Sequence, residues 1–317
     1  MLITITGNSV GNVALVEEDF AEAYISQHVG LVRLKEPAAA PYICRYLSPF
    51  SPGNAQIFLS QSGQSKPGLN LQNLRDLLIA SPPTARERDD IAETLTDVDA
   101  LLGALDRLIA KKRDLKQAAM QQLLNGQTRL PGLGGKWEVK RLGNIAEIVM
   151  GQSPSSLNYN STGYGLPLIQ GNADVADRKA IKRIFTTQVT KRGRAGDILM
   201  SVRAPVGEVS RTMFDVCLGR GVCAVRFPNE FLYHYLILLE PSWAKHSKGS
   251  TFDSVNSTDV RAVEINLPAD PAEQTAIATV LSDMDTELDA LLKRRAKTAA
   301  LKQGMMQELL TGRTRLV

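Results

Sequence analysis

Residues 115–130 read LKQAAMQQLLNGQTRL, and residues 301–316 read LKQGMMQELLTGRTRL. The match extends without a gap over 82–130 and 268–316, at a constant shift of about 186 positions and with roughly half of the aligned residues identical. Two copies of so long a unit do not make a solenoid, which needs three or more short repeats to bury a continuous core. The pattern indicates an internal duplication with pseudo-two-fold symmetry.

Both copies carry the signals of one long helix. The first begins with Thr84, followed three positions later by Glu87, a capping-box pattern in which both side chains satisfy free backbone amides. The second begins with Asp270-Pro271, an N-cap residue before a first-turn proline. Because neither copy has a proline farther along, each helix is expected to run about 40 residues until Gly126 or Gly312 ends it.

Apolar residues inside both helices recur in alternating steps of four and three, the spacing that keeps one stripe against a partner helix. We therefore predict that the two helices pack as an antiparallel coiled coil. The residues predicted to pair are Ile91, Leu95, Val98, Leu102, Leu105, Ile109, Ile277, Leu281, Met284, Leu288 and Leu291.

The segment between the helices loses the helical period and alternates short apolar runs with turns. A helix is expected at Phe231–Glu240. The predicted strands are Val139–Leu142, Ile145–Val149, Leu166–Ile169, Ile198–Val202, Gly207–Arg211, Val222–Phe227 and Val263–Leu267. This pattern predicts an α+β domain.

The residues before the first helix repeat only the later half of that domain. Gly11 aligns with Gly207, and Asn70 aligns with Asn256. The chain is therefore predicted to contain a partial globular domain, a long helix, a complete globular domain and a second long helix, at 1–81, 82–130, 131–267 and 268–317. A domain that lacks about 60 residues should leave unpaired strand edges and exposed apolar surface.

Composition bounds the class of protein. The chain is 44% hydrophobic but has no stretch near the roughly 20 apolar residues of a spanning helix, and no signal peptide, which predicts a cytoplasmic protein without a membrane partner. A net charge of +4 and a pI of about 8.9 are compatible with a polyanionic partner. The three cysteines and three histidines lack metal-site spacing, and no catalytic motif is present, so neither a metal nor an enzymatic activity is expected.

Basic and amide side chains of the complete domain are the candidate DNA contacts. The densest basic stretch lies between predicted strands, where a loop can follow a phosphate backbone, although a solvated loop has the same composition. Its residues are Arg178, Lys179, Lys182, Arg183, Lys191, Arg192 and Arg194. Candidates for base edges are Arg203, Lys245, Ser247, Lys248, Ser250 and Asn256, with Gln170, Asn172 and Gln188 as amides suited to adenine.

Three elements carry a resemblance to the DNA specificity subunit of type I restriction-modification systems. The block from Gly135 to Ala146, with Gly151 after it, looks like the start of a target recognition domain, and Gly196–Ser201 with Gly207 looks like its central strand pair. Asn266–Pro268, Glu273-Gln274 and the helix ending Glu308–Gly312 look like the spacer region of the family. The resemblance covers essentially the whole chain, but the first recognition domain lacks its opening half.

The resemblance implies a noncatalytic subunit that binds double-stranded DNA. Each recognition domain would read one half of a split target through the major groove, and the paired helices would fix the distance between the halves. Such subunits dock adenine methyltransferase subunits and, through them, ATP-dependent restriction and translocase subunits. S-adenosylmethionine, ATP and Mg²⁺ would therefore belong to the partner subunits, and this chain is expected to hold no cofactor.

Three alternatives remain open from the sequence. The chain could be a coiled-coil interaction scaffold that never binds DNA, or an inactive rearranged remnant of a specificity subunit. Two copies could also self-associate, each offering its complete domain to a palindromic target.

Overall fold

The computed structural model of the 317-residue chain describes residues 1–16, 20–61, 68–243 and 254–316. The chain divides into two compact units, here called unit 1 (Met1–Lys111 with Asp289–Val317) and unit 2 (Lys112–Leu288). The long helices α4 (Ala85–Leu123) and α8 (Pro271–Leu309) each contribute one part to each unit. No helix in the described ranges is long and apolar enough to cross a membrane. Helices and sheets occur together, which confirms the predicted α+β class.

The starts of the two 39-residue helices follow the sequence signals, with one correction. The hydroxyl of Thr84 accepts a hydrogen bond from the backbone N–H of Glu87 at 3.2 Å, and Asp270 accepts one from the N–H of Ala272 at 2.9 Å. The reciprocal half of the predicted capping box is wrong. The Glu87 carboxylate accepts hydrogen bonds from the guanidinium of Arg315 instead, because that cation is a stronger partner than a neutral backbone amide.

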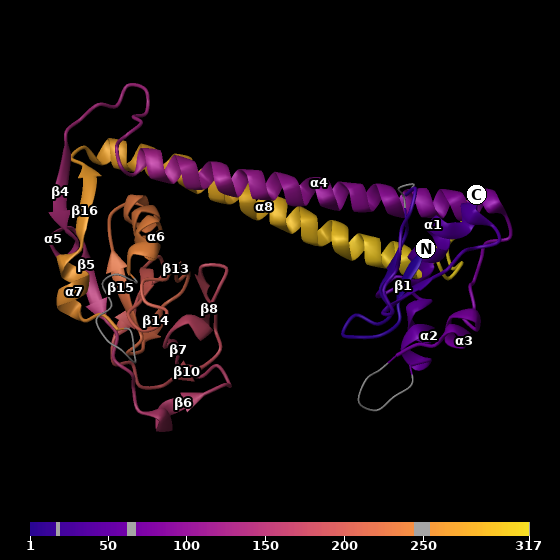
Figure 1. Cartoon of the computed structure of the whole chain (residues 1–317). Coiled ribbons are helices and arrows are strands. Elements are labelled where there is room, and N and C mark those ends of the chain that lie inside the picture. Colours follow the sequence, from indigo (N-terminus) through magenta and orange to yellow (C-terminus); the bar gives the residue numbers. More distant parts are fainter. Residues whose placement is uncertain (17–19, 62–67, 244–253, 317) are drawn as a thin grey trace. The chain divides into compact units, whose positions relative to one another are not determined.

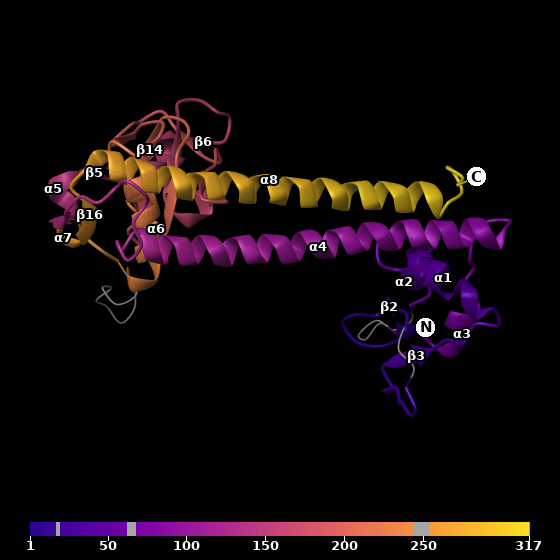
Figure 2. The same ribbon diagram turned by 90° about the horizontal axis from the view of Figure 1, so that it is seen from above.

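The two long helices run antiparallel inside each unit. In unit 2 the last turns of α4 lie beside the first turns of α8 (Figure 1; Figure 2), joined by Lys112–Glu287 at 2.6 Å and Lys116–Asp285. Arg129, which follows α4, pairs with Glu273 of α8 at 2.6 Å. In unit 1 the cross-helix pairs are Asp99–Lys302 at 2.6 Å and Asp106–Arg295 at 3.0 Å, and Arg315, which follows α8, pairs with Glu87 of α4 at 2.5 Å. Two pairs of unit 2, Lys116–Asp285 and Arg129–Glu273, have counterparts at equivalent positions in unit 1, Lys302–Asp99 and Arg315–Glu87. The duplication in the sequence is therefore also present in the ion pairs.

The described part of unit 2 contains three sheets and, besides the long helices, three α-helices. The six-stranded sheet has the order β5-β15-β12-β13-β9-β8, the five-stranded sheet β11-β14-β7-β10-β6, and the two-stranded sheet β16-β4. The strands are β4 (Trp137–Arg141), β5 (Glu147–Met150), β6 (Tyr159–Asn160), β7 (Leu166–Ile169), β8 (Val175–Ala176), β9 (Lys179–Ala180), β10 (Phe185–Thr186), β11 (Arg192–Gly193), β12 (Ile198–Ser201), β13 (Val209–Arg211), β14 (Val216–Leu218), β15 (Val222–Arg226) and β16 (Glu264–Pro268). The helices are α5 (Leu142–Ile145), α6 (Phe231–Trp243) and α7 (Ser257–Ala262).

The longer strands of unit 2 occur where the local sequence pattern predicts them, and the shortest strands do not. The strands predicted around β4, β5, β7, β12, β13, β15 and β16 are confirmed within two residues at their ends, as is the helix α6 at its start. Leu142 and Ile145 were predicted to lie in strands, but they begin and end the one-turn helix α5. The strands β6, β8, β9, β10, β11 and β14 were not predicted, because two or three residues are too few to show an alternating period.

Two cores hold unit 2 together, one on each face of β12. Ile198 and Met200 point into the larger core, which includes α6 and the adjoining turns of α4 and α8. Leu199 points the other way, into a smaller core that includes residues of β7 and β14 and therefore joins the two larger sheets. Because side chains alternate along a strand, one short strand connects both layers.

Unit 1 repeats the three central strands of the six-stranded sheet of unit 2, but one face of its sheet is more exposed. Its elements are β1 (Leu2–Thr4), β2 (Val13–Ala14), β3 (Val29–Leu31), α1 (Ala40–Leu47), α2 (Asn54–Leu59) and α3 (Leu71–Arg75), and its sheet order β2-β1-β3 matches β13-β12-β15. Leu31 is 39% exposed, whereas Ala224, its equivalent in unit 2, is fully buried. Phe20, Tyr24 and Ile25 are also exposed, which matches the expected exposed apolar surface.

Candidate nucleic-acid interface

Five loops of unit 2 converge beside the ends of β5, β7, β12 and β14. We call them together the loop face, and they are residues 151–158, 170–174, 188–191, 203–205 and 219–221. The N–H of Gly219 donates to the carbonyl of Ile169 at 2.7 Å, and the N–H of Val202 donates to the carbonyl of Gly221 at 2.9 Å. These bonds join loops that are far apart in the sequence.

Side chains complete the connection between the loops. The Ser153 hydroxyl accepts from the N–H of Arg220 at 3.1 Å, and the Gln188 side-chain oxygen accepts from the N–H of Ser155 at 3.0 Å. The buried carboxylate of Asp174 accepts from the N–H of Gln170 at 2.8 Å and closes the loop after β7. The loop face is therefore a hydrogen-bonded platform.

A hollow of about 610 Å³ lies in this platform. Its lining combines apolar surface with the polar side chains of Tyr159, Asn160, Gln170, Asn172 and Arg183. Amide and guanidinium groups of this kind present hydrogen-bond donors and acceptors to a ligand that enters from solvent. Such a surface suits a polar, flat-edged ligand such as a nucleobase.

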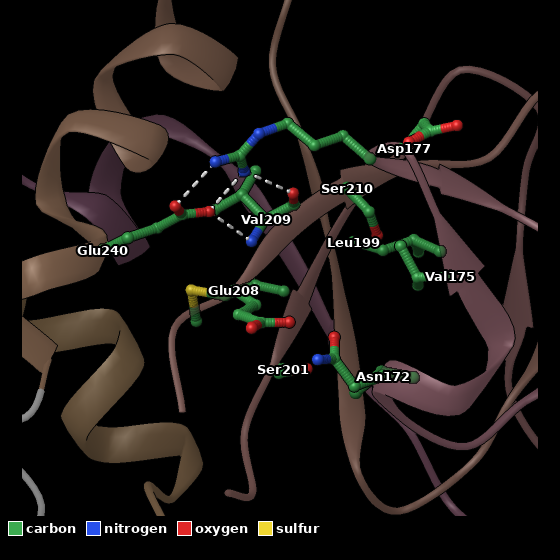
Figure 3. A pocket seen from close by; sticks show the side chains of 12 residues that line it. Asn172, Val175, Asp177, Leu199, Ser201, Glu208, Val209, Ser210 and Glu240 are labelled. Atoms are coloured by element: carbon green, nitrogen blue, oxygen red, sulfur yellow. Dashed lines mark hydrogen bonds and ion pairs between the residues drawn. The ribbon is translucent and has the colours of Figure 1, made fainter. Parts of the chain in front are cut away.

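The structure divides the predicted basic stretch instead of keeping it together. Glu240, which Figure 3 labels, accepts hydrogen bonds from Arg178 at 2.5 and 2.9 Å, and this contact raises the pKa of Arg178. Arg178 also donates to the carbonyl of Val209. It lines a separate hollow of about 300 Å³. Lys179 is exposed on β9. Arg178 is therefore held in an ion pair with α6.

Three further members of the stretch lie near the β13–β14 connection. Lys182 lies over the ring of Phe214 at 4.6 Å, and Arg192 pairs with Asp215 at 2.6 Å. A hydrogen bond from the N–H of Ala195, together with Arg192, holds the pKa of Asp215 below its usual range. Arg194 is exposed beside them.

The loop face holds the remaining basic side chains. Arg183 donates to the carbonyl of Ala173 at 2.7 Å and lies 3.7 Å from Asp174. Lys191 and Arg203 are exposed, and their charged groups make no hydrogen bond or ion pair with any residue that the structure describes. With respect to the described part of the chain, these two cations can therefore bind an anion from solvent.

The amide candidates also separate. Gln170 and Asn172 are exposed on the loop face. Asn172 lines the hollow of about 610 Å³ and also the hollow of about 300 Å³ that Figure 3 shows. Gln188 has its oxygen occupied by the N–H of Ser155 and the side chain of Asn158. Asn256 caps the start of α7, where its oxygen accepts from two backbone amides. The first two are free to contact a ligand.

The candidates Lys245, Ser247, Lys248 and Ser250 lie outside the described residues. Arg220 belongs to the loop face but was not among the predicted contacts, because it is far from the basic stretch in the sequence. The signal that points to it is its place between Gly219 and Gly221, a pattern typical of a tight turn with one projecting side chain. Within the described ranges, no group of His, Cys, Asp and Glu could hold a metal ion.

The predicted helix-pairing residues are all buried or half-buried. Those that are buried are Ile91, Leu95, Leu105, Ile109, Ile277, Leu281 and Leu288, and those that are half-buried are Val98, Leu102, Met284 and Leu291. Ile91 and Leu95 belong to the same core as Met306 and Leu310 near the end of α8. The start of each helix therefore packs against the end of the other.

Comparison with known protein families and relatives points to one class. The family model described as "Type I restriction modification DNA specificity domain" matches residues 134–302. A putative type I restriction enzyme MjaX specificity subunit of Methanocaldococcus jannaschii is 29% identical over 97% of this chain and 76% of its own length. The type I restriction enzyme MjaIX specificity subunit of the same organism is 29% identical over 47% of this chain and 38% of its own length.

Solved structures agree with this comparison. A chain from a study entitled "Structural basis underlying complex assembly and conformational transition of the type I R-M system" has a TM-score of 0.62 at 29% identity, covering 98% of this chain and 81% of its own. The HsdS subunit from Thermoanaerobacter tengcongensis has a TM-score of 0.52 at 31% identity, covering 87% and 70%. The S subunit from M. genitalium has a TM-score of 0.69 at 17% identity, covering 97% and 82%, and shows the shared fold.

Proposed function

The chain belongs to the family of type I restriction-modification DNA specificity domains, and on this premise we propose that it is a specificity subunit that binds double-stranded DNA through the loop face of unit 2. The observation that carries the proposal is a set of cations and amides on one hydrogen-bonded platform, which the described residues leave without a partner, inside the segment that the family model matches. Cations that neutralise phosphates give affinity, and amides that reach base edges give sequence preference.

The chain would act without chemistry of its own. Methyltransferase subunits would bring S-adenosylmethionine, and restriction subunits would bring ATP and Mg²⁺. The long helices would carry these partners, since α4 and α8 present charged outer faces between their cross-helix ion pairs. Because the proposed ligand is DNA, the complex would work in the cytoplasm.

Salt-dependent DNA binding tests the proposal. The purified chain, alone and with its methyltransferase partner, should bind duplex DNA with an affinity that falls steeply between about 50 and 200 mM salt. The double variant Lys191→Gln, Arg203→Gln should weaken binding uniformly across sequences and reduce the slope of log affinity against log salt by about 2, close to 1 per phosphate contact.

A matched variant isolates the loop face from overall charge. Lys136→Gln, Arg141→Gln also removes one lysine and one arginine from unit 2, but Arg141 lies on β4 in the separate two-stranded sheet and Lys136 directly precedes that strand. It should leave the slope within experimental error of the wild type. Equal effects of the two double variants, or binding that does not change with salt, would exclude the loop face as the DNA site.

A further inference from the structure

Arg220 occupies a fixed position at the tip of the loop face. It lies in the three-residue turn Gly219–Gly221, which joins β14 to β15. The turn closes on itself through the N–H of Val222, which donates to the carbonyl of Gly219 at 3.2 Å. With the bonds to Ile169, Ser153 and Val202 described above, every residue of the turn is held by its backbone.

Close packing leaves no room for a side chain at the two residues that flank Arg220, Gly219 and Gly221. A Cβ atom on Gly221 would lie 2.0 Å from the carbonyl oxygen of Gln170, and one on Gly219 would lie 3.0 Å from the Cα atom of Gln170. The backbone of the turn is therefore pressed against the loop after β7. Arg220 is the one residue of the three with a side chain, and it is exposed to solvent.

The guanidinium of Arg220 is unoccupied with respect to the described part of the chain. In unit 2, Arg178, Arg192, Arg211 and Arg226 are each bound to a carboxylate. No hydrogen bond or ion pair links the side chain of Arg220 to a described residue, and only its backbone N–H is engaged. The turn fixes the Cα position of Arg220, and a guanidinium without a partner there can offer two parallel donors to a ligand.

We propose that Arg220 reads a guanine in the major groove of the target, donating to O6 and N7, while Lys191 and Arg203 hold phosphates beside it. The proposal rests on the proposed function. A bidentate guanidinium fits the two adjacent acceptors of guanine, whereas a phosphate contact requires no fixed orientation. Lys191 is close to the turn because its carbonyl accepts from the N–H of Leu218 at 2.8 Å, one residue before Gly219.

The duplication suggests the substitution for the test. In unit 1 the equivalent turn is Ser26–His28, in which the N–H of Val29 donates to the carbonyl of Ser26 at 3.1 Å and the N–H of Ile5 donates to the carbonyl of His28 at 2.9 Å. Gln27 stands where Arg220 stands in unit 2. Arg220→Gln is therefore compatible with this type of turn, and glutamine pairs with adenine instead of guanine.

The experiment is methylation mapping with the intact complex. Wild-type chain, Arg220→Gln, Arg220→Lys and the control Arg141→Gln are each co-expressed with the methyltransferase subunit in a methylation-free host, and methylated adenines are mapped. Arg220→Gln should lower discrimination at one guanine position of the motif by about 5- to 150-fold, with a shift toward adenine, and leave the other positions unchanged. Arg220→Lys should keep part of the preference, and the control should match the wild type.

Binding to duplexes that carry the motif and its single-base variants gives the second readout. Uniform weakening of Arg220→Gln on all duplexes would show a phosphate contact and overturn the proposal, as would an unchanged motif. If the wild-type complex methylates no motif and binds DNA without salt dependence, the proposed function itself fails. Copurification of each variant with the methyltransferase separates a folding defect from a change in reading.

Discussion

The interface between α6 and the long helices should be sensitive to acid. His234 on α6 is 1% exposed, and its Nε2 lies 3.0 Å from the hydroxyl of Ser282 on α8. Its Nδ1 has no hydrogen-bond partner among the described residues and lies 3.9 Å from a carboxylate oxygen of Asp285. Burial, with a smaller contribution from the charge of Lys116, lowers the pKa of His234 to about 3. The imidazole is therefore neutral in the folded protein at physiological pH.

The sign and size of the effect follow from linkage. Unfolded, His234 takes up a proton with an ordinary pKa of about 6.5, whereas the folded protein binds that proton only near pH 3. Stability is therefore complete above about pH 6.5 and is lost as the pH falls from there toward 3, because the unfolded chain binds more protons. At about pH 5 the loss from this one group is on the order of 2 kcal/mol.

Tryptophan fluorescence measures the loss of stability in unit 2, which contains His234. Both tryptophans of the chain, Trp137 and Trp243, lie in unit 2, so urea unfolding followed by their emission reports this unit. The free energy of unfolding should fall between about pH 7.5 and 5 by about 2 kcal/mol more for the wild type than for His234→Gln. His28→Gln, at an exposed histidine of unit 1, should behave like the wild type. Identical pH dependence of wild type and His234→Gln would refute the argument.

Three further substitutions test other parts of unit 2. Arg129→Met leaves the fully buried carboxylate of Glu273 without its partner and should lower stability by about 3 kcal/mol, seen as a lower urea midpoint; an unchanged midpoint would contradict this. Gly207→Ala places a Cβ atom 2.2 Å from an indole ring at a residue with φ +88°, so stability should fall by about 1–3 kcal/mol from backbone strain and further from the close contact. Gly132→Ala is the control: Gly132 has φ +77° but no atom within 4 Å of the added Cβ, so stability should fall from the strain alone. Asn256→Ala removes the cap of α7 and should cost about 1 kcal/mol, measured as faster hydrogen exchange in the helix; unchanged exchange would argue against the cap.

The long helices were predictable because their signals are local. A cap residue, an apolar stripe and a terminal glycine all lie within one continuous stretch, and the duplication presents each signal twice. Gly126 and Gly312 adopt φ of +69° and +71°, which matches their expected place just past the helix ends. The binding of the Glu87 carboxylate to Arg315, in place of the backbone amide at the start of its own helix, was not predictable. It depends on which distant side chain the fold brings close to Glu87.

The candidate site was less predictable for the same reason. Neighbours in an extended segment point to opposite faces, so a basic run in the sequence does not remain a basic patch in space. Lys182 lies over Phe214, while the next residue, Arg183, contacts the loop after β7. The acidic partner of Arg178 is Glu240, a residue of α6 that no local pattern connects to it. Charge density along the chain therefore does not show which basic side chains share one surface.

The duplication provides an internal control for the function of the loop face. Thr6 in unit 1 and Arg203 in unit 2 occupy equivalent positions. Each forms an isolated β-bridge with a residue that directly precedes a buried apolar side chain, and these two apolar side chains are themselves equivalent. Gln27 in unit 1 is the equivalent of Arg220 in unit 2. Unit 1 forms the same backbone hydrogen bonds with the neutral residues, so the fold does not require positive charge at these positions. A feature that folding does not require and that remains unpaired at the surface is best explained by a ligand. The contrast between the two copies therefore separates the residues that build this domain from the residues that we expect to contact DNA.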